Sequence, residues 1–387
     1  MSTLHPAWVL LPWLMAWLTI GLIARLAPQS ETPGHFATID GLRGHLAFAV
    51  FLHHGVIWHA YLRTGVWTAP ALPFYNQLGQ SSVALFFMIT AFLFTHKLLD
   101  SAERPIDWLR LYTSRVLRLT PLYLVAMAML IAVCGTLTDW HRQVPARELR
   151  QALWHWLGFS IGGMPDINGV PHTFTLIAGV TWSLPYEWLF YLALPCLALA
   201  MRRQAPRWLA ALTLLGALGI WSHHKQAIML LAFAMGGVAA WLARRPAFRQ
   251  WAQGRLAPWL VLLALGHTVV TQPTAYAWQP LLALGLAFAL IAAGCTLFGS
   301  LTSRLSRRLG DLGYGIYLLH GLLLFATLHF AVGENRAVLW SDAQHATLLT
   351  ALAPVVVVLA HAAFRWVEAP AMAQTGRLVA WWRTRHP

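Results

Sequence analysis

Two residues of one apolar segment have the types and the spacing for acid–base or group-transfer chemistry. Arg43 and His54 are eleven residues apart in the stretch 39–54. At about 100° per residue, they return to one helix face after three turns plus roughly 20°, with an axial separation of about 16 Å. One helix face then carries a cation near its end and an imidazole near the bilayer middle, where such groups by default indicate function. The spacing equally fits a structural role, in which His54 bonds a neighbouring helix and Arg43 marks the inner leaflet.

A carboxylate in another apolar segment is a candidate partner for His54. Glu187 lies about five residues, or 7–8 Å, inside the outer end of the segment 182–201. His54 lies about eight residues, or 12 Å, below the same surface, so we expect the two side chains to converge. A carboxylate in the hydrocarbon must be paired or neutral. The alternative is a structural pair between Glu187 and a neighbouring helix.

Two arginines have the spacing of an anion site. Arg115 and Arg118 are at i and i+3, on one side of a helix. Guanidinium groups form bidentate bonds to phosphate, so the pair suits a phosphate-bearing ligand. Cytoplasmic loops of membrane proteins also collect arginine, and the composition alone favours that simpler explanation.

The composition predicts that these groups are positioned by membrane-spanning helices. The chain has 387 residues, of which 58% are apolar and only 10% are charged, whereas a soluble domain carries about 25% charged residues. The mean hydropathy is +0.57. The 21 tryptophans fit two interfacial belts, where amphipathic rings are enriched.

The distribution of charge and cysteine excludes several other classes of protein. The formal net charge is +14, but the basic residues form short runs between apolar segments, as the positive-inside rule expects. We therefore expect no nucleic-acid partner. Cys134, Cys196 and Cys295 all lie in apolar segments, which argues against a disulfide framework. His45, His53, His59, His223 and His224 lack a carboxylate or cysteine at metal-ligand spacing, so no metal site is predicted.

The hydropathy pattern predicts an all-α polytopic membrane protein with about eleven transmembrane helices. The shortest segments need tilt or partial burial to match a hydrocarbon core of about 30 Å. The predicted spans are 8–26, 43–62, 80–98, 119–138, 182–201, 206–221, 227–243, 256–272, 280–299, 313–332 and 346–367.

The alternation of basic loops predicts an extracytoplasmic N-terminus and a cytoplasmic C-terminus. The long connection 139–181 contains the half-apolar piece 152–161. This piece is too short to cross and is expected to be an interfacial or re-entrant helix.

Five segments and a closing one resemble, in order, the motifs of the membrane acyltransferase-3 family, which are O-acetyltransferases of bacterial surface glycans. The opening motif is Asp-Gly-Leu-Arg at 40–43 followed by His54, and the second is Phe-Phe-Met-Ile-Thr-Ala-Phe-Leu at 86–93. Thr90 and Ala91 replace the family's Ser and Gly. The other motifs are Arg-Val-Leu-Arg-Leu-Thr-Pro at 115–121, Trp-Ser-Leu-Pro-Tyr-Glu at 182–187, Gly-Tyr-Gly-Ile-Tyr-Leu-Leu-His at 313–320 and Val-Glu-Ala-Pro at 367–370.

The resemblance implies a domain organisation and a location. The family core has ten helices, so residues 1–38 are an additional N-terminal helix and linker, 39–372 the acyltransferase-like domain, and 373–387 a basic cytoplasmic tail. The implied location is the bacterial inner membrane. In the closing motif, Glu368 and Arg365 at i and i+3 are expected to pair at the cytoplasmic surface.

The resemblance also implies a reaction. Acetyl-coenzyme A, or another acyl-coenzyme A, is the donor substrate, and no permanently bound cofactor is expected. The acceptor is a hydroxyl of an extracytoplasmic or lipid-linked glycan, such as O-antigen or exopolysaccharide, with glycan-assembly proteins as possible partners. The implied catalytic residues are His54, as general base or as acyl carrier, and Glu187. The residues expected to bind coenzyme A are Arg43, Arg115 and Arg118, and those expected to contact substrate are Trp182, Ser183, Tyr186 and His320. For His320, a satisfied core histidine is an equally good interpretation.

Two other classes of function remain as alternatives. A secondary transporter would use His54 and Glu187 as a proton relay, although the sequence shows no matching pair of interrupted helices in two halves. A structural subunit of a glycan-export complex would need neither residue.

Overall fold

The computed structural model describes residues 4–26, 36–70, 72–102 and 105–385, and this part of the chain is helical, without β-strands. It divides into two units, and both are discontinuous in sequence. The first unit comprises Met1–His96 and Gln226–Ala360, and the second comprises Lys97–Lys225 and His361–Pro387. Part of the predicted linker, 27–35, lies outside the described residues.

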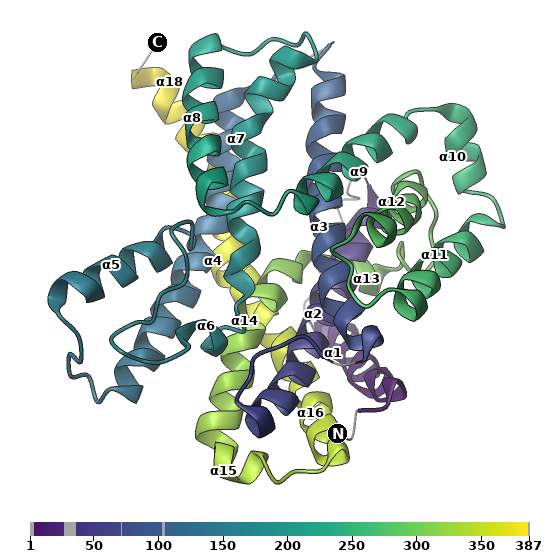
Figure 1. Cartoon of the computed structure of the whole chain (residues 1–387). Coiled ribbons are helices and arrows are strands. Elements are labelled where there is room, and N and C mark those ends of the chain that lie inside the picture. Colours follow the sequence, from purple (N-terminus) through teal and green to yellow (C-terminus); the bar gives the residue numbers. More distant parts are fainter. Residues whose placement is uncertain (1–3, 27–35, 71, 103–104, 386–387) are drawn as a thin grey trace. The chain divides into compact units, whose positions relative to one another are not determined.

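The first unit contains most of the helices. They are a 3₁₀ turn (Pro6–Val9), α1 (Leu10–Leu26), α2 (Ala37–Thr64), most of α3 (Pro73–Asp100), α9 (Ile228–Leu242), α10 (Pro246–Ala252), α11 (Ala257–Thr271), α12 (Trp278–Ala292), α13 (Arg304–Asp311), α14 (Gly313–Ala326), a π-helix (Thr327–Val332), α15 (Glu334–Ala337) and most of α16 (Asp342–Ala363). Helices α9, α12 and α11 pack side by side in that order (Figure 1).

Helix α2 is the centre of the first unit, because it packs against both α13 and α14. Two glycines of its opening motif make the close contact possible. A Cβ at Gly41 would lie 1.8 Å from the carbonyl oxygen of Leu301, and one at Gly44 would lie 2.4 Å from the carbonyl carbon of Leu309. Backbone atoms leave no room for these methyl groups, so the motif glycines fix the position of α2 and of the arginine between them.

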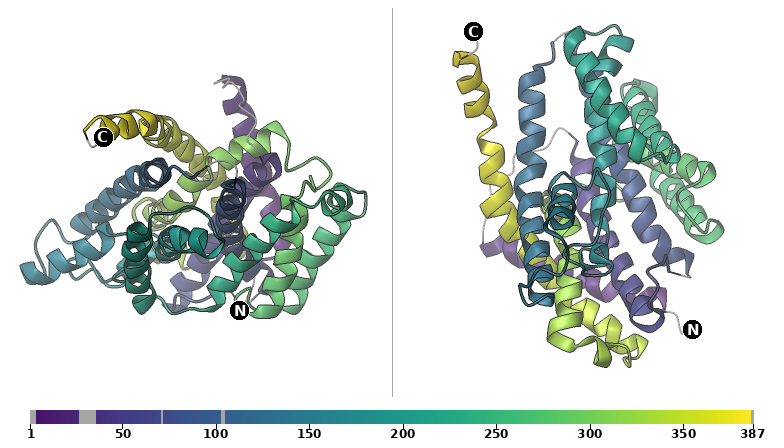
Figure 2. Two further views of the ribbon diagram at one scale, coloured as in Figure 1. Left: turned by 90° about the horizontal axis from the view of Figure 1, so that it is seen from above. Right: turned by 60° about the vertical axis from the view of Figure 1, so that its left-hand side comes forward.

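The second unit is built around α4 (Trp108–Leu137). Its other elements are α5 (Ala146–Leu157), α6 (Thr173–Leu176), a 3₁₀ turn (Val180–Ser183), α7 (Leu184–Ala200), α8 (Arg207–His223), a π-helix (Phe364–Glu368), α17 (Ala369–Ala373) and α18 (Thr375–Arg385). Helix α18 runs beside α4 (Figure 2), and Arg383 forms an ion pair with Asp107 at 2.7 Å. The predicted basic tail is therefore a helix packed within this unit.

The all-α polytopic membrane fold is confirmed, whereas the number of spans stays a prediction. A helix lies at each of the eleven predicted positions. Six described helices are long and apolar enough to cross a membrane, and the bent pair α9–α10 is a seventh candidate. Helix α2 has 28 residues but is not among the six, because its histidines lower its hydropathy. The predicted span 280–299 is a helix only to Ala292, since Gly294 adopts a φ of 115° that ends it.

The connection between α4 and α7 contains the expected short helix, α5, which has twelve residues and begins earlier than predicted. Trp154 on this helix is 77% exposed. After α5, however, the chain turns inward. Thr173, Ile177 and Thr181 are all fully buried, so α7 begins inside the second unit and not at an outer surface.

Candidate functional site

Arg43 and His54 both lie on α2, which is continuous between them, as the spacing predicted. Arg43 is partly exposed in the second turn. It lies near the Asp40 carboxylate, as does Arg307 of α13. The first unit therefore holds a cluster of charged groups about 16 Å along the helix axis from His54.

His54 forms a hydrogen-bonded pair with His320 of α14. Its Nδ1 atom lies 2.9 Å from Nε2 of His320, and the two rings are nearly parallel, with centroids 5.0 Å apart and an interplanar angle of 23°. The packing of α14 on α2 brings these histidines together from positions 266 residues apart. The fifth motif thus supplies the partner of the first.

The hydrogen bonds of His320 determine which nitrogen of His54 carries the proton. His320 Nδ1 lies 2.9 Å from the carbonyl oxygen of Ile316. A carbonyl only accepts, so Nδ1 of His320 is protonated, and its Nε2 in the neutral ring is an acceptor. His54 must then donate from Nδ1, which leaves a lone pair on its Nε2. A neutral imidazole held in this tautomer is suited to accept a proton or to attack a carbonyl.

Exposure separates His54 from the neighbouring histidines. His54 is partly exposed, whereas His320 is fully buried and His53 is 7% exposed. The Nδ1 atom of His53 lies 2.8 Å from the carbonyl oxygen of Tyr75, and its ring packs against Gly79. His54 is therefore the most exposed of these three histidines.

In the second unit, Glu187 is bound to the next turn of its own helix. The hydroxyl of the buried Tyr191 donates to Oε1 of Glu187 and also interacts with the Arg115 side chain. The Tyr112 hydroxyl donates to the Tyr191 carbonyl at 3.1 Å. These contacts link α7 to the first turns of α4.

The contact of Tyr191 with Arg115 shows which end of α4 lies beside this part of α7. Arg115 is 22 residues before Leu137, the last residue of α4, which is about 33 Å of helix. Tyr191 therefore lies towards the Trp108 end of α4, whereas the depth of Glu187 below the outer surface stays a prediction.

Arg118 forms an ion pair with Glu368, a pairing that the sequence analysis did not predict. Its Nη1 lies 3.2 Å from Oε2 of Glu368, whose side chain is fully buried, whereas that of Arg118 is 13% exposed. Glu368 ends the π-helix that follows α16, and such local changes of helical register often occur at functional sites. The expected surface pair of Glu368 with Arg365 is wrong, because Arg118 is the partner and the carboxylate is inside.

The other predicted substrate contacts are packed around the start of α7. Ser183 donates to the Val180 carbonyl at 3.4 Å. Tyr186 is 1% exposed, with its ring edge-on to both Trp182 and His224. A substrate-binding role for Trp182, Ser183 and Tyr186 stays a prediction.

The structure thus groups the predicted site residues into two centres. His54 and His320 form one, and Arg115, Glu187, Arg118 and their partners form the other. The expected convergence of His54 with Glu187 joins residues of the two units and stays a prediction. Among the described residues, no group of three or more His, Cys, Asp or Glu side chains suits a metal ion. Sequence reasoning missed Tyr191, although its i+4 position from Glu187 was a usable signal.

Comparison with known proteins defines the class. The model of the acyltransferase domain of the acyltransferase-3 family matches residues 36–363. The chain belongs to this family and is a multi-pass membrane acyltransferase. No curated protein gives a significant match to the chain, and neither does any solved structure.

Proposed function

We propose that this acyltransferase moves an acyl group, acetyl in the simplest case, from acyl-coenzyme A to a hydroxyl of an extracytoplasmic or lipid-linked glycan. The observation that carries the proposal is the state of His54. It is partly exposed, and the 2.9 Å bond from its Nδ1–H to His320 leaves Nε2 with a lone pair. The glycan acceptor follows from the resemblance of the motifs.

The proposed reaction uses His54 Nε2 as the base. Nε2 takes the proton of the acceptor hydroxyl while the hydroxyl oxygen attacks the thioester carbonyl carbon. The carbon–sulfur bond then breaks, and the imidazolium returns its proton to the departing sulfur. The products are the acyl ester and free coenzyme A. In the competing mechanism Nε2 attacks the thioester itself and an acyl-histidine passes the group to the acceptor.

Arg43 is the residue we propose to hold the coenzyme A phosphates. It shares α2 with His54, and their axial separation of about 16 Å is comparable to the length of a pantetheine arm. Arg115 and Arg118 remain proposed as further phosphate contacts, although Arg118 pairs with Glu368 and Arg115 interacts with Tyr191. We propose that Glu187 orients His54, with the protein in the bacterial inner membrane, its N-terminus outside and its C-terminus in the cytoplasm.

The test uses purified protein in lipid nanodiscs with radiolabelled acetyl-coenzyme A. We expect wild type to bind the donor and to hydrolyse it slowly without acceptor. His54→Ala should bind without turnover, and Arg43→Gln should lose binding. The matched controls are His329→Ala and Arg336→Gln, which change a partly exposed histidine and an exposed arginine elsewhere in the first unit. They should behave as wild type.

Three outcomes decide the proposal. Label retained on His54 after denaturation supports the acyl-histidine mechanism. Turnover without retained label supports the general-base mechanism. Wild-type protein that ignores acetyl-, propionyl- and succinyl-coenzyme A would overturn the proposal and favour the proton-relay transporter.

A further inference from the structure

We propose that Tyr61 and Trp67, backed by Trp58, form an aromatic platform beside His54 that binds a pyranose ring of the acceptor. This inference rests on the proposed function, because it identifies the acceptor subsite of the same reaction. It assigns the substrate class to residues that lie outside the family motifs quoted above.

The platform is a consequence of how α2 ends. The helix stops at Thr64, and Gly65 takes a left-handed conformation with φ of 69° while its N–H donates to the Tyr61 carbonyl at 2.8 Å. A glycine cap of this kind ends a helix and reverses the chain locally. The chain that leaves Gly65 brings Trp67 back over the last turns of α2. Trp67 is only partly exposed, although the residues on both sides of it are exposed.

The three aromatic rings contact one another and reach the reactive histidine. The Trp67 ring lies edge-on to Trp58 and Tyr61, with centroids 5.3 and 5.4 Å away. Its plane is within 19° of the His54 imidazole, at a centroid distance of 6.3 Å. Trp58 is 1% exposed and forms the rigid base, while Tyr61 and Trp67 remain partly exposed. An aromatic surface therefore continues from the loop to the proposed catalytic base.

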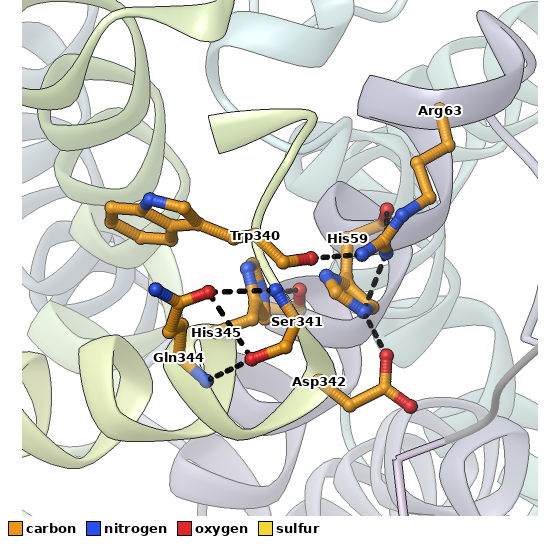
Figure 3. A network of polar contacts seen from close by, with 8 residues as sticks. His59, Arg63, Trp340, Ser341, Asp342, Gln344 and His345 are labelled. Atoms are coloured by element: carbon orange, nitrogen blue, oxygen red, sulfur yellow. Dashed lines mark hydrogen bonds and ion pairs between the residues drawn. The ribbon is translucent and has the colours of Figure 1, made fainter. Parts of the chain in front are cut away.

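Polar side chains fix the end of the helix that carries the platform (Figure 3). The guanidinium of Arg63 donates to the Trp340 carbonyl and contacts His59, whose Nε2 lies 2.8 Å from Oδ1 of Asp342. These bonds tie the last turn of α2 to the start of α16. Arg63 is exposed and the Asp342 side chain is 22% exposed. At about 100° per residue Arg63 lies on the opposite side of α2 from Tyr61, so these groups hold the helix end from the side opposite the platform.

This combination of groups matches the chemistry of a sugar. One face of a pyranose ring presents C–H bonds, which pack on aromatic rings, and its hydroxyls bond charged and amide groups at the edge. Tryptophan and tyrosine offer such amphipathic contact area at low entropic cost. The Trp58 indole N–H is buried beneath the platform and has no hydrogen-bond partner among the described residues. A sugar ring on Trp67 would place its hydroxyls near the His54 imidazole, because the two aromatic rings have centroids 6.3 Å apart.

The test measures sugar binding without acyl-coenzyme A, so that failure of the proposed acyl transfer does not affect it. The probes are the methyl glycosides of galactose, mannose and rhamnose, and saturation-transfer difference NMR reports their contact with protein in lipid nanodiscs. Nanodiscs avoid glycoside detergents, which would compete. We expect transfer to the ring C–H protons of at least one probe, with about tenfold weaker binding for Trp67→Ala and near wild-type binding for Trp67→Tyr.

Controls separate a local effect from loss of fold. Trp278→Ala removes a tryptophan that is 60% exposed at the start of α12, and it should bind the probes as wild type does. Tyr61→Leu should also weaken sugar binding. This variant replaces Trp67→Ala in the test if Trp67→Ala does not fold. No transfer to any of the three probes from wild type, or equal binding by Trp67→Ala and wild type, would overturn the inference.

Discussion

The two polar centres of this protein satisfy their groups in opposite ways. In the first unit, a neutral hydrogen bond joins His54 to His320 and leaves one ring nitrogen with its lone pair. In the second unit, Arg118 is paired with a fully buried carboxylate, and Glu187 is bonded by Tyr191. The histidine centre keeps a reactive atom available, whereas the arginine–carboxylate centre uses its charges on one another.

This difference teaches how to separate chemistry from architecture among intramembrane polar residues. Both centres are costly to bury, so cost alone does not identify the catalytic one. What distinguishes them is whether a lone pair or charge remains for a substrate after the internal bonds are counted. By this criterion we propose His54 as the catalytic residue, and we expect Glu368, which is paired with Arg118, to be structural.

The largest expected effect is on activity at the histidine centre. His54→Ala removes the proposed base. General acid–base catalysis by one side chain contributes about 10²–10⁴-fold to a rate, so we expect turnover to fall by that factor. Because His54 is partly exposed, the fold should survive, and thermal unfolding should shift little. Release of coenzyme A from acetyl-coenzyme A, followed with a thiol reagent, checks the rate. If His54→Ala keeps activity within threefold of wild type, the histidine centre is not the catalytic one, and the distinction between the two centres fails.

The second prediction concerns stability at the arginine–carboxylate centre. Arg118→Ala removes an ion-pair partner of the buried Glu368 carboxylate, which we expect to cost about 3–5 kcal/mol in unfolding free energy. Replacing both residues, as in Arg118→Met with Glu368→Gln, should recover most of that loss. Unfolding in mixed micelles measures both variants. If Arg118→Ala unfolds like wild type but no longer binds acyl-coenzyme A, Arg118 is a phosphate ligand as the sequence suggested.

A smaller effect is expected at His320, which we interpret as a positioning residue. His320→Leu removes the acceptor for His54 Nδ1–H and should lower kcat about tenfold, because one neutral hydrogen bond contributes about 0.5–1.5 kcal/mol. His320→Gln keeps an acceptor and a donor and should recover most of the rate. The pH–rate profile is the decisive measurement, since loss of the fixed tautomer changes its shape. An unchanged profile in His320→Leu, with a raised KM for the acceptor, would restore the direct substrate contact.

The sequence predicted the elements better than the contacts between them. Helical spacing placed Arg43 and His54 correctly on one helix, because that relation depends only on the 3.6-residue period. The pairing of Arg118 with Glu368 depends on long-range packing of α4 with the π-helix after α16, which no local pattern encodes. The inward fold of residues 173–183 before α7 is likewise not revealed by hydropathy. The interpretation of His320 as a positioning residue depends on its two hydrogen bonds, to His54 and to the Ile316 carbonyl, which only the structure shows.

The smallest effect sharpens the comparison at another histidine of α2. The Trp13 indole N–H donates to Nδ1 of His45 at 3.2 Å, and Nε2 of His45, which then carries the proton, lies 3.0 Å from the Ser306 hydroxyl oxygen. Both ring nitrogens are hydrogen-bonded, so we expect His45 to have a structural role and to attach the additional helix α1 to α2. Trp13→Phe keeps most of the ring packing and removes one donor, so we expect a loss of about 0.5–1.5 kcal/mol in unfolding free energy with nearly unchanged turnover. If turnover falls more than tenfold while stability changes this little, α1 influences the active site directly. In that case, hydrogen bonds at both ring nitrogens would not be enough to identify a histidine as structural.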